Sequence, residues 1–154
     1  MKDWHDMHSV FLDTNFFLDI LDKSRPRHDR ANAVLVTFIE HNVQLYTSSD
    51  IMSTVSYFLQ KSLGIQKTVL SIGYIIESVD VLSLTNSDFL ALNEIILKYY
   101  SGGHIDYEDC MQMYLAHKHR IDAIVTSDKR FCETMRKFFD MDIVLLDDIK
   151  FSGQ

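Results

Sequence analysis

Acidic side chains stand at three places where a chain of this type could bring them together. Asp13 and Asp128 each close a short apolar run that is typical of a buried strand. In an open α/β sheet, ligands collect just beyond the carboxyl ends of parallel strands. Asp106 and Asp109 stand three residues apart where a helix is expected to start, a spacing that places both on one helix face. Three separate segments therefore deliver carboxylates that can converge.

Each carboxylate also has a purely structural explanation. Asp106 could cap the expected helix, and Asp109 could favour the positive end of its dipole, whereas Glu108 is expected to point elsewhere into solvent. Asp13 could cap a helix as well, but a carboxylate at a buried strand end has to be hydrogen-bonded, paired or metal-bound. Hard oxygen ligands without His or Cys select Mg²⁺ or Mn²⁺. Jointly, the set favours a divalent-metal site over four separate structural roles.

Composition limits the classes of protein to consider. The 154 residues are expected to form one domain, 1–154, in the cytoplasm, because no apolar run is long enough for a membrane span and two cysteines form no disulfide framework. The net charge of −7 argues against broad nonspecific binding to nucleic acid. The negative charge does not exclude a nuclease, since cations bound at an acidic site reverse the local electrostatic field there.

Strand and helix patterns alternate along the chain. The order predicts a three-layer α/β/α fold with a central parallel sheet. The expected strands cover 10–12, 43–46, 79–84, 121–126 and 143–146. The expected helices cover 16–21, 31–40, 51–61, 65–77, 85–100, 106–118 and 129–139.

Three acidic motifs in this order resemble those of PIN domains. They are Leu12-Asp13-Thr14-Asn15, Asp106-Tyr107-Glu108-Asp109 and Val125-Thr126-Ser127-Asp128. PIN domains are metal-dependent nucleases and include the VapC-type toxins of toxin–antitoxin pairs. The resemblance spans nearly the whole chain. It implies a parallel sheet covered by helices on both faces, and cleavage of single-stranded RNA with Mg²⁺ or Mn²⁺. It also implies a possible antitoxin partner and a possible homodimer.

The resemblance assigns roles to single residues. The metal ligands, direct or through water, would be Asp13, Asp109 and Asp128. Asp106 would complete the catalytic set as an outer acidic partner. Asn15 and Thr126 would hold carboxylates or a substrate phosphate. A divalent ion held there would activate water and stabilise charge on the phosphate.

One position departs from the family pattern. Many PIN domains carry a glutamate on the helix after the second strand, and here that slot holds Thr54. Asp50, one turn earlier, could substitute in part, although a first-turn acid also favours the helix dipole. The departure keeps a second interpretation open, in which the protein is a non-catalytic PIN-like scaffold that binds RNA or protein. A phosphotransferase of haloacid-dehalogenase type is disfavoured, because Asn15 occupies the place of its second aspartate.

A basic loop between residues 23 and 30 is the first candidate for phosphate contact. Arg25 and Arg27 are its expected RNA-binding residues, and the alternative is a solvated turn. Lys129 and Arg130, directly after Asp128, form a second candidate.

Overall fold

A single parallel sheet forms the centre of the computed structural model, which describes residues 4–128, 138 and 142–150. Its strand order is β3-β2-β1-β4-β5, and every described pairing is parallel. The strands are β1 (Ser9–Leu12), β2 (Gln44–Ser48), β3 (Val79–Leu82), β4 (Ala123–Thr126) and β5 (Asp142–Leu145). The predicted parallel sheet is confirmed.

The two central strands are buried on both faces. Val10, Phe11 and Leu12 of β1 are inaccessible to solvent, as are all four residues of β4. Strands covered on both faces read as continuous apolar runs, which is why the pattern was visible in the sequence. Leu12 pairs with Val125, and this register ends β1 and β4 at the same edge of the sheet. Asp13 and Thr126 are thereby placed beside each other.

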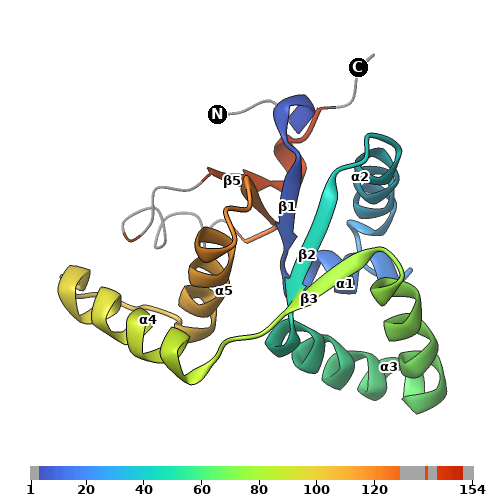
Figure 1. The fold of residues 1–154 in the computed structure, drawn as a ribbon. Helices are drawn as coiled ribbons and strands as arrows, with labels where there is room; N and C mark the ends of the chain where they lie inside the picture. The colour runs from blue at the N-terminus through green and yellow to red at the C-terminus, as the bar shows by residue number, and fades with distance from the viewer. Residues whose placement is uncertain (1–3, 129–137, 139–141, 151–154) are drawn as a thin grey trace.

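Helices cover both faces of this sheet (Figure 1). α1 and α2 lie on one side, α5 lies on the other, and α4 packs outside α5. The predicted three-layer α/β/α fold is therefore confirmed. The helices are α1 (Thr14–Leu21), α2 (His28–Glu40), α3 (Ser49–Ile76), α4 (Asn86–Tyr99) and α5 (Tyr107–Lys118), with short 3₁₀ turns η1 (Trp4–Asp6) and η2 (Leu146–Asp148).

Two of the expected helical regions need separate comment. The helix expected over 129–139 lies outside the described residues. The helices expected at 51–61 and 65–77 are both present within α3, and they meet at Gly64, whose φ of 78° and ψ of 168° are not helical. None of the described helices is both long and apolar enough to cross a bilayer.

The break in α3 yields a prediction about stability. Gly64 occupies a backbone region open essentially to glycine alone, so Gly64→Ala should lower the free energy of unfolding by about 1–3 kcal/mol. Gly73 is helical, and a Cβ added at either glycine would meet no atom within 4 Å. Gly73→Ala should therefore raise the free energy of unfolding by about 0.5–1 kcal/mol. Urea denaturation of both variants measures the two free energies of unfolding. If both variants changed this free energy in the same direction, a non-helical Gly64 within α3 would be contradicted.

Candidate active site

Thr126 connects the ends of β1 and β4 at the carboxyl edge of the sheet. Its hydroxyl donates to Asp13 Oδ2 over 2.5 Å and accepts from the backbone N–H of Asp128 over 3.0 Å. The other oxygen of Asp13 accepts from Phe16 N over 3.0 Å and so caps α1. Asp13 is therefore both a helix cap and a member of the strand-end cluster, because one carboxylate has enough lone pairs for both.

Three of the four predicted carboxylates line one cavity at this edge. Asp13, Asp109 and Asp128 come from the end of β1, the first turn of α5 and the loop after β4. The cavity measures about 80 Å³. The described residues that line it are Asp13, Thr14, Asn15, Ile51, Glu108, Asp109, Gln112 and Asp128.

Asp106, the fourth predicted carboxylate, is not among these lining residues. Its Oδ1 accepts from Asp109 N over 3.1 Å, so it is the N-cap of α5, and its side chain is exposed. Asp106 acts on the site through its charge, since it contributes to the raised pKa of Asp109.

Glu108 corrects an expectation from the sequence. It was expected to point elsewhere, but it lines the cavity and accepts a hydrogen bond of 3.4 Å from Thr54 Oγ1. Glu108 and Gln112 stand four residues apart, and Asp109 lies on the adjoining part of the same face of α5. This i, i+4 spacing was the available signal for two lining residues, Glu108 and Gln112, that sequence reasoning missed.

The carboxylates in the cavity are held in an environment that disfavours charge. Burial raises the pKa of Asp13 to about 6, against the opposing hydrogen bonds from Thr126 and Phe16 N. Burial and then the negative charge of Asp106 raise the pKa of Asp109 to about 7. Burial also raises the pKa of Glu108, with a further contribution from Asp106. Close, partly desolvated carboxylates are stabilised by a cation between them.

The donor set and the size of the cavity fit a hydrated divalent ion. In the described part of the chain, no three Asp, Glu, His or Cys side chains are already arranged as a metal-binding group. Mg²⁺ is commonly bound through one or two carboxylates while it keeps several waters. A cavity of about 80 Å³ has room for such waters, each of which needs about 10–15 Å³. Asp13, Asp109 and Asp128 can therefore hold an ion directly or through water.

The predicted RNA-binding arginines are engaged within the protein. Arg25 Nε pairs with Asp19 Oδ1 at 2.6 Å, and its Nη2 donates to Asn15 Oδ1 over 3.4 Å. Asp19 is almost fully buried, so its charge requires this partner. Arg27 pairs with Asp147 at 3.0 Å. These contacts connect the loop to α1 and to the turn after β5, while Arg25 and Arg27 stay partly exposed, so their contact with RNA remains a prediction.

The remaining polar residues near the motifs have different positions. Asn15 lines the cavity while accepting from Arg25, which connects the basic loop to the back of the site. Cys110 is buried, and burial raises the pKa of its thiol to about 11, so it is not an activated nucleophile. Lys129 and Arg130 lie outside the described residues.

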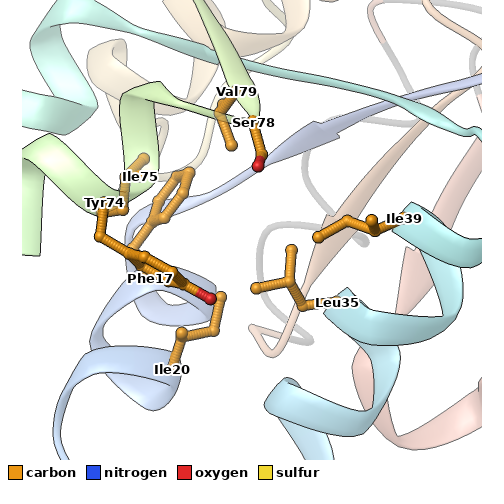
Figure 2. Close-up of a pocket in the computed structure, with 8 residues that line it drawn as sticks. All are labelled: Phe17, Ile20, Leu35, Ile39, Tyr74, Ile75, Ser78 and Val79. Carbon is orange, nitrogen blue, oxygen red and sulfur yellow. The ribbon is translucent and has the colours of Figure 1, made fainter.

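A second pocket lies away from the carboxylates, between α1, α2 and the end of α3. Figure 2 shows that mostly aliphatic and aromatic side chains surround it, with the hydroxyls of Tyr74 and Ser78 as the polar groups drawn. Its lining residues carry no carboxylate or imidazole, so it offers no group for hydrolytic chemistry. They are Phe17, Ile20, Leu35, Ile39, Tyr74, Ile75, Ser78 and Val79.

The sequence and the fold both have counterparts among known proteins. The family model of the PIN domain matches residues 10–137. The chain belongs to the PIN domain family. Over 122 residues it is 28% identical to Ribonuclease VapC1 of Aquifex aeolicus, a match that covers 79% of this chain and 83% of that protein.

Solved structures of PIN toxins share the fold at low sequence identity. VapC20 of Mycobacterium tuberculosis, described as a sarcin–ricin-loop-cleaving toxin, is 17% identical with a TM-score of 0.68, over 86% of this chain and 98% of that one. DNA-bound VapBC of Salmonella typhimurium is 18% identical with a TM-score of 0.70, over 91% of this chain and 99% of that one. At these identities the similarity shows that the fold is shared.

The raised pKa of Asp109 predicts how stability depends on pH. Its folded pKa of about 7 exceeds the ordinary 3.8, so the native state binds this proton more tightly than the unfolded chain does. That contribution favours folding at low pH and is lost as pH rises through 7. Without metal, Asp109→Asn should therefore be more stable than wild type above pH 7, by on the order of 1 kcal/mol. The difference should shrink towards pH 4.

Urea denaturation in EDTA across this pH range measures the effect. Asp80→Asn removes one charge from the exposed edge strand β3 and serves as the matched control. A loss of stability in Asp109→Asn that does not vary with pH would show that Asp109 only supports the helix.

Proposed function

We propose that this PIN domain is a Mg²⁺- or Mn²⁺-dependent endoribonuclease that cleaves single-stranded RNA at the acidic cavity. The observation that carries the proposal is the convergence of Asp13, Asp109 and Asp128 on one cavity with the pKa of two of them raised. The similarity to a protein named Ribonuclease VapC1 supports the same reaction. A cytoplasmic location accords with this activity.

The chain's own residues prepare the site in defined ways. Asp13, Asp109 and Asp128 would hold the ion, and Thr126 fixes the orientation of Asp13 before the ion arrives. When bound, the ion supplies activation of water and stabilisation of charge on the phosphate. Ile51, which is buried, adds an apolar side chain to the wall of the cavity.

We propose further that Glu108 replaces the glutamate missing at the Thr54 slot. The Thr54 hydroxyl lies 3.2 Å from the Asp50 carbonyl oxygen and 3.4 Å from Glu108 Oε1, so the residue in that slot stands beside a carboxylate without supplying one. Glu108 reaches the cavity from α5 instead of α3, which leaves the acidic character of the site intact. Asp50 affects Glu108 through its charge and is not among the described lining residues.

We also propose a protein partner for this chain. DNA-bound VapBC of Salmonella typhimurium is a structural neighbour, and we propose an antitoxin partner for this chain as well. Large apolar side chains remain exposed on α3 and on α4, which lie at different ends of the molecule (Figure 1), and each helix offers apolar surface to an antitoxin or to a second copy in a homodimer. They include Ile65, Val69, Leu70, Tyr74, Leu90 and Leu97.

A non-catalytic scaffold is the second candidate function, and the threonine at position 54 is the observation that favours it. Such a scaffold would keep the fold and an RNA- or protein-binding surface without cleavage. Assays of cleavage and of metal binding separate it from the nuclease.

Cleavage of single-stranded RNA should require Mg²⁺ or Mn²⁺. Asp13→Asn and Asp109→Asn should each lower kcat by about a hundredfold or more, because each removes a carboxylate that would hold the divalent ion at the reacting phosphate. Asp80→Asn should leave kcat unchanged, since Asp80 lies on the exposed edge strand. Gel assays of labelled RNA with and without EDTA measure these rates.

Binding of the ion can be followed without any substrate. Mn²⁺ at a hundredfold excess over its dissociation constant should stabilise the wild type by about 2.7 kcal/mol. Asp109→Asn should lose most of this gain. Full cleavage in excess EDTA would contradict the metal mechanism, and metal binding without cleavage would favour the scaffold.

Glu108→Gln should weaken binding of Mn²⁺ by about tenfold to a hundredfold, as for other groups that tune a metal site. Adding Thr54→Glu to Glu108→Gln returns a carboxylate to the slot on α3 and should recover part of the loss. Isothermal titration with Mn²⁺ measures both affinities. If Glu108→Gln binds Mn²⁺ as tightly as wild type, Glu108 is only a solvated acid at the rim.

A further inference from the structure

Gln112 carries a buried amide group with an unmet hydrogen-bond donor. The side chain lies on α5, and the residue is only 4% exposed. Its Oε1 accepts from the Ser48 hydroxyl over 2.9 Å, while Nε2 has no hydrogen-bond partner among the described residues. A buried donor without a partner costs free energy that a methionine of similar size would not. Packing alone does not account for glutamine at this position.

The orientation of the amide is set by the start of α3. Ser48 is the N-cap of α3, and its oxygen accepts from Ile51 N over 3.1 Å. The proton of this hydroxyl then remains for Gln112 Oε1, so Nε2 is the end of the amide without a partner among the described residues. Ser48 is itself fully buried, so the arrangement is held within the packed core. The donor is therefore positioned before any ligand binds.

The cavity that Gln112 lines is the one that holds the carboxylates. Glu108 and Asp109 precede it on the same helix face, and neither accepts a hydrogen bond from it. A cation can satisfy the carboxylates but cannot accept a hydrogen bond from an N–H group. The unmet donor is matched instead by an anionic oxygen that enters the cavity together with the cation. In a site for RNA, that oxygen belongs to a phosphate.

We propose that Gln112 binds the substrate, with Nε2 donating to a non-bridging oxygen of the scissile phosphodiester. This inference rests on the proposed nuclease function. It makes Gln112 a substrate-binding residue and Ser48 its positioning residue. A neutral amide suits this place, because it binds the phosphate without competing with the cation for the carboxylates. Its burial removes competition from water and strengthens the contact.

Steady-state cleavage of a single-stranded RNA oligonucleotide with Mn²⁺ tests the proposal. Gln112→Met removes the donor at similar volume, and Gln112→Glu keeps the acceptor for Ser48 but replaces the donor by a negative charge. Gln112→Met should lower kcat/KM by about tenfold to a hundredfold, the range expected for one hydrogen bond to a charged group. Gln112→Glu should lower it further. Gln66→Glu, at an exposed position of α3, is the control for added charge and should match wild type.

Two measurements without turnover accompany the kinetics. In the Asp109→Asn background, fluorescence anisotropy with labelled RNA should show weaker binding once Gln112→Met is added. Thermal melts of Gln112→Met should keep the wild-type response to Mn²⁺, because the methionine leaves the carboxylates in place.

The outcomes separate this inference from the proposed function. If wild type cleaves RNA and both Gln112 variants keep its kcat/KM, the inference is overturned and the nuclease proposal stands. If the variants lose activity together with thermal stability and the response to Mn²⁺, Gln112 is a structural residue and the inference is also overturned. If wild type neither cleaves nor binds RNA, the proposed function fails and the inference fails with it.

Discussion

The bridge that Thr126 makes between two neighbouring strand ends determines the geometry of the whole site. Its hydroxyl accepts from the Asp128 backbone and donates to Asp13, so the end of β4 fixes the carboxylate that follows β1. This contact exists because β1 and β4 are parallel and end in register. Their apolar residues, buried on both faces, hold that register, since a shift along the strands would carry a polar end residue such as Asp13 into the packed interior. Packing in the core thus sets distances in the cavity.

The same edge of the sheet concentrates destabilising features. Burial desolvates both Asp13 and Asp109, and this is the main reason why their pKa values rise to about 6 and about 7. Gln112 adds a buried donor without a partner among the described residues. A protein selected only for stability would replace these groups by apolar ones. Their concentration in one cavity is expected of a site that is completed by a cation and an anionic ligand.

Charges elsewhere in the molecule are used to hold the fold together. Arg25 neutralises the buried Asp19, and Arg27 pairs with Asp147 near the last strand. On the outer side, Lys118 holds the pKa of the buried Asp88 well below its usual range, and Asp88 also caps α4 with Thr85. These pairs use cations of an acidic protein within the fold, while contact of Arg25 and Arg27 with RNA stays a prediction.

The sequence by itself determined the fold and the family. Continuous apolar runs marked the buried strands, helical periodicity marked the layers around them, and the order of the acidic motifs indicated the PIN domain. These features depend on residues that are neighbours along the chain, so local patterns report them.

Only the tertiary structure decided how single side chains divide their roles. Asp106 turns back to cap its helix, Glu108 enters the cavity beside Thr54, and Arg25 is taken by a buried aspartate. The role inferred for Gln112 depends on its burial and on its unmet donor, which only the structure shows. Apart from the local cap by Asp106, each outcome depends on a partner from another segment or on exclusion of water. The sequence pattern of a single segment contains neither, because hydrogen-bond partners and desolvation arise only when the segments pack together.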